Sequence, residues 1–310
     1  MKKISVLFLI VLMCTGCSMQ PVSVTDFALD TSVTVTLYGG DEETARECID
    51  LCKKYENLFS KTLMGSDIWN INQSGSAEVT DETTELIKKA EHYSELSDGL
   101  FDISVGGASR LWDFDEKIIP DKESLCAAVQ NINHEDILIS GNTITVKDGM
   151  SLDVGGIAKG YIADKMKEFL KAQGIESGII NLGGNVLCIG DKNGKPFEIG
   201  IQKPYAPGET VRTLSVSDKS VVTAGIYERS FEKDGVLYHH ILDPKTGYPV
   251  QNNLASVTVV TEKSVDGDAL STALFLMGEE KGIEFAKENN ISAVFVTKNM
   301  EVIRINTEKR

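Results

Sequence analysis

The chain has 310 residues, of which 42% are hydrophobic and 25% are charged. These values are ordinary for a globular protein that buries a full core, as one large domain or two closely packed ones. The net charge is −15, and no basic stripe follows the first three residues. Because nucleic-acid binding requires clustered Lys and Arg, the composition argues against a nucleic-acid partner.

The beginning of the chain has the pattern of a bacterial export signal. Lys2 and Lys3 precede an apolar run from Ile4 to Met13, which is too short to span a membrane. The segment Cys14-Thr15-Gly16-Cys17 follows, and two small residues before a cysteine resemble a lipobox. We therefore expect Cys17 to carry a lipid. Cleavage of an ordinary secretory signal after a small residue is the alternative.

This interpretation divides the chain into three parts. Residues 1–17 are expected to be a lipoprotein signal segment, residues 18–25 a tether, and residues 26–310 a single domain. The expected location is the bacterial cell membrane, with the domain held by its lipid on the extracytoplasmic side.

The apolar periodicity and the turn residues predict the following elements in chain order. They are a strand from Phe27 to Tyr38, helices from Asp41 to about Phe59, from Thr80 or Asp81 to Gly99 and from Asp121 to Val129, a hairpin over 136–147, a helix from Ala158 to Gln173, several strands between Gly178 and Val260, a helix from about Gly267 to Met277, and a last helix–strand pair. Helices and strands are grouped and do not alternate regularly. The pattern therefore favours the α+β class, with mostly antiparallel sheets and packed helices.

A glycine-rich turn lies inside the segment SLDVGGIAKGYIADKM, residues 151–166. We expect a strand carrying Asp153, then Gly155-Gly156, then a helix with Lys159 in its first turn. Adjacent glycines let a backbone approach a ligand closely, and the start of a helix attracts phosphate oxygens. A plain strand-to-helix turn explains this segment equally well. A second turn, INLGGN at residues 180–185, supports phosphate binding.

Two adjacent histidines occur in the segment YHHILDPKTGYP, residues 238–249. A histidine near a carboxylate can activate a hydroxyl nucleophile, although a lone histidine is more often a structural residue. Neighbouring side chains on a strand point to opposite faces, so only one of the pair can enter a site. We favour His240.

A helix near the end of the chain carries hard oxygen ligands. In SVDGDALSTALFLMG, residues 264–278, Asp268 and Thr272 are four positions apart and share one helix face. Carboxylate and hydroxyl oxygens suit Mg²⁺. The alternative is that Asp266 or Asp268 only caps the first turn of this helix.

Taken together and in order, these segments resemble the ApbE family. The family patterns LDxGGIAKGYxxD, NxGG, HIxDPxTGxP and DALxTALxxxG are matched here by LDVGGIAKGYIAD, NLGGN, HILDPKTGYP and DALSTALFLMG. An earlier segment, FDISVGGASRLWDF at residues 101–114, is similar to the family's FDxTVGxxxxLWxF. The resemblance covers most of the chain from about Phe27 onward and implies an ApbE-like, T-fold-like architecture.

The resemblance implies a role for each matching position. Mg²⁺ would be held by the backbone carbonyl of Gly156 and the side chains of Asp268 and Thr272, and His240 would be the catalytic base. FAD, as the substrate, would contact a set of residues spread over the chain: Leu29, Leu100, Phe101, Asp102, Asp153, Lys159 and Leu242.

The implied activity is Mg²⁺-dependent transfer of FMN from FAD to a Thr or Ser hydroxyl of an acceptor flavoprotein, with release of AMP. The implied acceptors are flavoprotein subunits of membrane redox complexes or secreted flavin reductases. Two alternatives remain open: an FAD pyrophosphatase that yields FMN and AMP, and a flavin-binding lipoprotein without catalysis. The nearest internal match to the acceptor motif is Gly106-Gly107-Ala108-Ser109, which lacks the first hydroxyl residue, so the sequence argues against self-flavinylation.

Three segments depart from the family pattern. The family's Met-Gly-Thr is Leu29-Asp30-Thr31 here, its Ser-Thr-Tyr is Ser60-Lys61-Thr62, and its Thr-Ser-Gly is Thr223-Ala224-Gly225. The aromatic residue expected near the flavin is therefore replaced by Thr62. These departures concern the flavin side of the site and leave the expected metal ligands and His240 unchanged.

Overall fold

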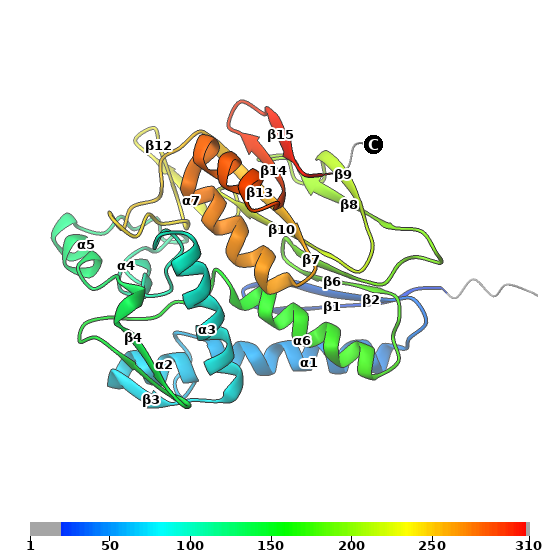
Figure 1. The fold of residues 1–310 in the computed structure, drawn as a ribbon, viewed down its shortest axis with the longest axis horizontal. Helices are drawn as coiled ribbons and strands as arrows, with labels where there is room; N and C mark the ends of the chain where they lie inside the picture. The colour runs from blue at the N-terminus through cyan, green and yellow to red at the C-terminus, as the bar shows by residue number, and fades with distance from the viewer. Residues whose placement is uncertain (1–19, 308–310) are drawn as a thin grey trace, which may run out of the picture.

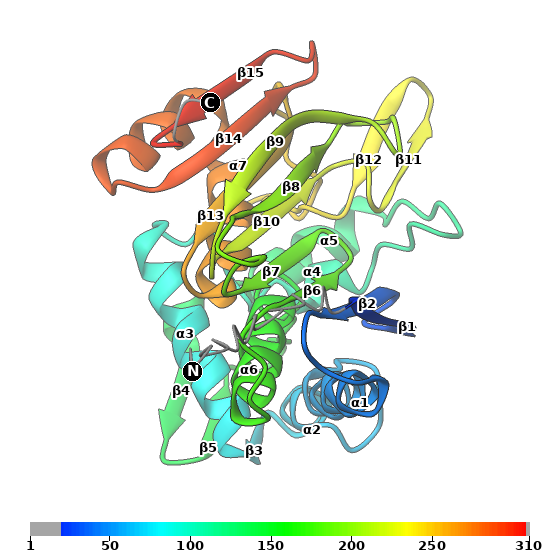
Figure 2. The ribbon, with the colours of Figure 1, turned by 90° about the vertical axis from the view of Figure 1, so that its right-hand side faces the viewer.

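The structure is a computed structural model that describes residues 20–307. The expected signal segment and Cys17 lie outside the described residues. An eight-stranded antiparallel sheet in the order β1-β2-β6-β7-β10-β13-β14-β15 forms the centre of the fold, and helices α1, α6 and α7 pack against one face of it (Figures 1 and 2). The expectation of an α+β fold with mostly antiparallel sheets is confirmed.

The helices and strands have the following bounds. The helices are α1 Glu42–Phe59, α2 Asp67–Ser74, α3 Asp81–Leu96, α4 Gly106–Ser109, α5 Lys122–Val129, α6 Ala158–Ala172 and α7 Ser264–Glu288, with a short 3₁₀ turn at His134–Asp136. The strands are β1 Val22–Ala28, β2 Thr31–Leu37, β3 Ser76–Glu78, β4 Ile137–Ser140, β5 Thr143–Val146, β6 Gly178–Leu182, β7 Asn185–Ile189, β8 Phe197–Gln202, β9 Thr210–Val216, β10 Ser220–Gly225, β11 Ser230–Lys233, β12 Val236–His239, β13 Leu254–Thr261, β14 Ser292–Thr297 and β15 Val302–Ile305.

The first strand differs from the prediction in two ways. The single strand expected from Phe27 to Tyr38 is a hairpin, because Leu29 and Asp30 adopt φ values of 54° and 55° and turn the chain between β1 and β2. Positive φ at both central residues is the geometry of a tight two-residue hairpin turn. In addition, β1 begins at Val22, so this strand occupies the second half of the segment expected to be a tether.

The helix starts predicted from capping residues agree with the structure. Asp41, Thr80 and Asp121 are the N-cap residues of α1, α3 and α5. Each side chain accepts a hydrogen bond from a backbone N–H in the first helical turn, which satisfies a group that would otherwise lack a partner. The short helix α2 was not predicted.

Helices α6 and α7 pack unusually closely. A Cβ atom at Gly160 in α6 would lie 2.4 Å from the carbonyl oxygen of Ser264 at the start of α7, so only glycine fits there. Further along α7, Gly278 has φ 80° and ψ −178°, which are not helical values. Two helices therefore meet at Gly278, in agreement with the predicted helix end near Met277.

The opposite face of the large sheet is covered by the β8–β9 ribbon. Phe197, Ile201 and Leu214 of this ribbon pack with Cys188 and Val294 of the sheet in a second apolar cluster. Among the described residues, no helix has both the length and the apolar character that crossing a bilayer requires.

Candidate functional site

The segment that leads into α6 is an ordered loop, and the strand expected to carry Asp153 is not formed. The side chain of Asn72 binds the backbone of Leu152, accepting from its N–H at 2.6 Å and donating to its carbonyl at 2.9 Å. The carboxylate of Asp153 then accepts the Gly155 N–H at 3.0 Å, which bends the chain in an Asx turn. Backbone pairing is limited to an isolated bridge between Ser151 and Val105 and to the Asp153 N–H, which donates to the Ile103 carbonyl at 2.7 Å. Side chains make the other hydrogen bonds of this loop.

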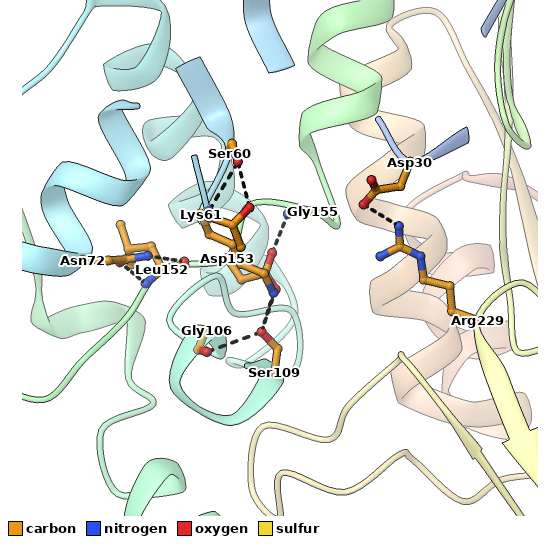
Figure 3. A network of polar contacts seen from close by, with 11 residues as sticks. Asp30, Ser60, Lys61, Asn72, Gly106, Ser109, Leu152, Asp153, Gly155 and Arg229 are labelled. Carbon is orange, nitrogen blue, oxygen red and sulfur yellow. Dashed lines mark hydrogen bonds and ion pairs between the residues drawn. The ribbon is translucent and has the colours of Figure 1, made fainter. Parts of the chain in front are cut away.

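Asp153 belongs to a compact polar network with Lys61 and Ser109 (Figure 3). The ammonium group of Lys61 lies 2.5 Å from Asp153 Oδ2 and donates to Ser109 Oγ at 2.9 Å. The hydroxyl of Ser109 donates to the same Asp153 oxygen at 2.7 Å. Lys61 comes from the loop after α1 and Ser109 from the end of α4, so three distant parts of the chain meet here.

The charge state of Asp153 results from opposing effects. Removal from water is the largest effect and raises the pKa of this carboxyl group. The charge of Lys61 and the hydrogen bonds from Lys61, Ser109 and Gly155 together outweigh it, so the pKa lies below the usual value for aspartate. Asp153 is therefore ionised at neutral pH.

The junction between α6 and α7 holds the second carboxylate of the site. Asp268 in α7 is 6% exposed, and its Oδ2 accepts the Gly160 N–H at 2.8 Å. Asp268 therefore caps α6, whereas the first turn of its own helix is bound by Asp164, which accepts the N–H groups of Ser264 and Val265. The alternative that Asp268 caps its own helix is wrong.

Burial raises the pKa of Asp268, while Lys159, the Gly160 N–H and the side chain of Asn185 act in the opposite direction. The buried Nδ2 atom of Asn185 has no partner within hydrogen-bonding distance. It therefore lowers the pKa of Asp268 from beyond that distance. A buried carboxylate with this environment is stabilised by any additional cation.

Two of the three expected Mg²⁺ ligands, Gly156 and Thr272, lie where the glycine turn meets α7. A Cβ atom at Gly156 would lie 3.9 Å from Thr272 Oγ1 and 3.1 Å from the ring of Phe101, so α7 and the glycine turn are in contact there. Between residues 20 and 307, no three His, Cys, Asp or Glu side chains are placed to hold a metal. A carbonyl, a carboxylate and a hydroxyl still form an all-oxygen set, which fits Mg²⁺ because this ion retains several water ligands.

The two histidines point in opposite directions, as strand alternation predicts. His239 ends β12, is 1% exposed, donates from Nε2 to the Val250 carbonyl at 3.1 Å and packs edge-on against Phe275. His240 is exposed, and its backbone N–H donates to the Arg229 carbonyl at 3.2 Å. Only His240 is available for chemistry with a substrate.

The environment of His240 favours its neutral form. Surrounding protein atoms disfavour the imidazolium, and Lys159 and Arg229 repel it, so the pKa lies below the usual value for histidine. Because the ring keeps contact with solvent, this effect is weaker than for a fully enclosed histidine. The Nδ1 atom lies 3.4 Å from the Arg229 carbonyl oxygen, which can only accept a hydrogen bond. Nδ1 therefore carries the proton, and Nε2 is free to accept one.

An exposed ion pair forms the other side of the site. Arg229 lies 2.9 Å from Asp30, which occupies the turn of the first hairpin beside Leu29. The Leu29 N–H donates to Glu56 at 2.8 Å, which ties the hairpin to α1. Figure 3 shows Gly155 between this ion pair and the Lys61 network.

The segment from Leu100 to Asp102 is only partly joined to this group. Phe101 contacts the glycine turn, but the buried carboxylate of Asp102 accepts hydrogen bonds from Ser104 and from the His134 N–H. Burial raises the pKa of Asp102 above its usual value. Asp102 also lines a cavity of about 690 Å³ together with Gly99, His134 and Pro244. Leu242 is buried in a neighbouring apolar cluster with Trp112.

The structure thus brings most of the expected residues to one place. Gly156, Phe101 and Thr272 are in contact, and Lys159 acts electrostatically on both Asp268 and His240. The sequence did not reveal that Ser109 and Arg229 belong to the site. Lys61 was noticed only as a departure from the family pattern, and that departure was the available signal.

Comparisons with known proteins identify the family of the chain. The sequence model of the ApbE family matches residues 29–295. A Klebsiella pneumoniae relative named FAD:protein FMN transferase is 37% identical over 281 residues, which cover 87% of each chain. A Treponema pallidum relative with the same name is 35% identical over 274 residues, covering 81% of this chain and 76% of the relative.

Solved structures give the same result for the fold. The ApbE protein of Thermotoga maritima superposes with a TM-score of 0.85 at 33% identity and covers 92% of this chain and 97% of that one. The flavin transferase ApbE of Vibrio cholerae superposes with a TM-score of 0.82 at 28% identity, covering 92% and 96%. The expected ApbE-like architecture is confirmed, and this chain belongs to the ApbE family.

Proposed function

We propose that this protein is an FAD:protein FMN transferase that uses Mg²⁺ to move FMN from FAD onto a Thr or Ser hydroxyl of an acceptor, releasing AMP. The observation that carries the proposal is the position of Lys159, whose charge acts on both the carboxylate of Asp268 and the imidazole of His240. A cation, a metal-binding carboxylate and a base in one site are the requirements of phosphoryl transfer.

The start of α6 is the proposed phosphate site. No side chain caps this helix from its own N-cap position, and the Gly155-Gly156 turn allows a ligand to approach the backbone closely. Lys159 in the first turn adds a mobile positive charge. Together these groups would hold the diphosphate of FAD.

The proposed metal ligands are the Gly156 carbonyl, Asp268 and Thr272. When bound there, Mg²⁺ supplies positive charge that offsets the charge of the diphosphate. The Gly160 N–H holds the carboxylate of Asp268 in place, and this hydrogen bond and the charge of Lys159 favour its charged form against the effect of burial. The rigid packing of α6 on α7 fixes the distance between these ligands.

His240 is the proposed base. Its neutral form predominates at neutral pH, and its Nε2 atom is free because Nδ1 faces the Arg229 carbonyl. Nε2 would accept the proton of the acceptor hydroxyl while the oxygen attacks the phosphorus of the FMN half of FAD. AMP then leaves with the oxygen that had bridged the two phosphates.

Water could replace the acceptor hydroxyl, because His240 is exposed to solvent. This openness is the observation that favours FAD pyrophosphatase activity as the second candidate. Incubation of the protein with FAD, Mg²⁺ and an acceptor flavoprotein separates the alternatives. Equal amounts of AMP and protein-bound flavin support transfer. AMP with free FMN indicates hydrolysis, and the absence of AMP indicates a binding protein without catalysis.

We also propose that a lipid on Cys17 holds the enzyme on the extracytoplasmic side of the membrane. Such an anchor would raise the effective concentration of the enzyme near membrane-bound or secreted flavoproteins. Metabolic labelling with palmitate should tag the full-length protein, and Cys17→Ser should abolish the tag. Cys14→Ser is the matched control and should keep it. An unlabelled wild-type protein would remove the anchor and leave the enzyme chemistry standing.

A further inference from the structure

The hydroxyl group of Ser109 has no role in the proposed transfer, yet it lies in the site. Ser109 is half-buried at the end of α4 and donates to Asp153 Oδ2 at 2.7 Å. Its oxygen accepts a hydrogen bond from Lys61 at 2.9 Å. A hydroxyl oxygen has two lone pairs, so one remains available for bond formation.

This arrangement has the geometry of an activated nucleophile. A nucleophile becomes reactive when a base lies within hydrogen-bonding distance and a third group orients the base. Asp153 is ionised and can receive the hydroxyl proton, as the catalytic aspartate of protein kinases does. The Gly155 N–H holds its second oxygen at 3.0 Å, and the charge of Lys61 stabilises negative charge that develops on Ser109 Oγ.

The same chain contains a matched pair outside the site. The hydroxyl of Ser124 donates to Asp121 Oδ2, also at 2.7 Å. That pair is exposed at the start of α5, where it caps the helix. Because the serine–aspartate distance is identical, the difference at Ser109 is its position beside Lys61 and the glycine turn.

We propose that Ser109 is an internal acceptor that takes FMN from FAD when no acceptor protein is present. The inference rests on the proposed transferase activity. Ser109 Oγ attacks the phosphorus of the FMN half, its proton passes to Asp153 and then to water, and the bond to the bridging oxygen breaks. The products are a phosphodiester between Ser109 and FMN, and AMP. The segment Gly106-Gly107-Ala108-Ser109 ends in the residue that is modified, despite its incomplete match to the acceptor motif.

The test is to incubate the purified protein with FAD and Mg²⁺ without an acceptor, and then to unfold it and remove free flavin. We expect the intact mass to increase by one FMN less one water, and the peptide containing Ser109 to carry the flavin. The peptide containing Ser124 should be unmodified. A parallel reaction with an acceptor flavoprotein measures the proposed function separately.

Variants of Lys61, Ser109 and Asp153 test whether the modification depends on these three residues. Ser109→Ala should abolish the label, Ser109→Thr should keep it, and Ser124→Ala should not change it. Asp153→Asn should slow labelling by about 10²–10⁴-fold, the usual contribution of a positioned base. Lys61→Met should also slow it, while Lys61→Arg should retain more of the rate.

Three other outcomes would overturn the inference that Ser109 accepts FMN. Labelled acceptor together with an unlabelled enzyme would refute the internal acceptor and leave the transferase standing. Flavin on a residue other than Ser109 would refute it as well. If neither the enzyme nor the acceptor is labelled, the proposed function fails and the inference fails with it.

Discussion

The two sides of the site are built in different ways. On one side, α6 and α7 meet through a glycine without room for a methyl group, and Asp268 is almost completely buried. On the other side, the Asp30–Arg229 and Lys61–Asp153 pairs keep contact with solvent. The buried side has one arrangement enforced by close packing, whereas the open side is held by ion pairs between loops.

This difference suggests a division of roles. The proposed metal ligands and phosphate site require fixed distances, and their residues lie at the helix junction. The groups proposed to meet the flavin and the acceptor lie on the open side, where Leu29, Asp30 and Thr62 depart from the family pattern. Variation on the open side can change the acceptor or the balance between transfer and hydrolysis without altering the metal site.

The largest effect is expected at Asp268. Asp268→Asn keeps an oxygen that can accept the Gly160 N–H but removes the charge, so FMN transfer should fall by about 10³-fold while the thermal stability stays close to that of the wild type. Steady-state AMP release and a melting curve measure the two quantities. Chelation of the wild type with EDTA should cause a similar loss. A variant that remains fully active in EDTA would contradict the metal assignment.

The second largest loss of transfer activity is expected at His240. His240→Ala should lower transfer by about 10²-fold, the lower end of what a positioned base contributes, and should leave FAD binding nearly unchanged. In the wild type, the rate should decline on the acid side only below the ordinary histidine pKa of about 6.5, since the pKa of His240 is lowered. Equal activity of His240→Ala and wild type would refute the role.

Gly160 tests the close packing of the buried side. Gly160→Ala places a methyl group 2.4 Å from a backbone oxygen and should lower the free energy of unfolding by about 1–3 kcal/mol. Gly107→Ala is the control, because its methyl group would meet Ala128 at 3.9 Å, an ordinary contact. Denaturant unfolding should show no loss for this control. Equal effects of both substitutions would mean that the junction can relax.

His239 should affect stability and not chemistry. His239→Ala removes a buried ring packed on Phe275, which should cost about 0.5–3 kcal/mol of unfolding free energy. Burial, the neighbouring His240 and Lys298 lower the pKa of His239 to about 4. The unfolded chain therefore binds a proton more readily, and the wild type should lose stability as the pH falls from about 6.5 to about 4. This part of the pH dependence should disappear in His239→Ala when melting is measured across that range.

The smallest effect is expected for the exposed pair. Arg229 and Asp30 are 55% and 76% exposed, so their interaction should contribute no more than about 1 kcal/mol. A double-mutant cycle with Arg229→Ala and Asp30→Ala measures this coupling by denaturant unfolding. A much larger coupling would mean that the open side is as rigid as the buried side.

The two sides also differ in how well the sequence predicted them. On the buried side, the sequence predicted that Asp268 and Thr272 share one face of a helix, because they lie one turn apart in a clear apolar pattern. Such local spacing is readable in a sequence. Capping residues such as Thr80 located the helix starts for the same reason. The packing of α6 on α7 through Gly160 was not predicted.

The open side could not be predicted because its contacts join residues far apart in the chain. Lys61 meets Asp153 across 92 positions, and Arg229 meets Asp30 across 199. The segment around Asp153 is not an extended strand: its backbone pairs with residues 103–105 only at an isolated bridge, and the side chain of Asn72, 80 residues before Leu152, binds the backbone of Leu152. Periodicity within a short window carries no information on such long-range contacts.

The interruption of α7 at Gly278 has a consequence for protein engineering. The backbone leaves helical geometry there, and Asn252 donates to the Phe275 carbonyl at 2.8 Å, which closes the first helix before the second begins. In a continuous helix, each inserted residue would rotate every side chain beyond it by about 100°. Here the helix is interrupted at Gly278, so an insertion after Gly278 would not rotate the side chains before it. A change in the length of the second helix would therefore disturb its own packing, where Gly282 lies close to the Leu274 carbonyl and the Phe295 ring, while Asp268 and Thr272 keep their orientation.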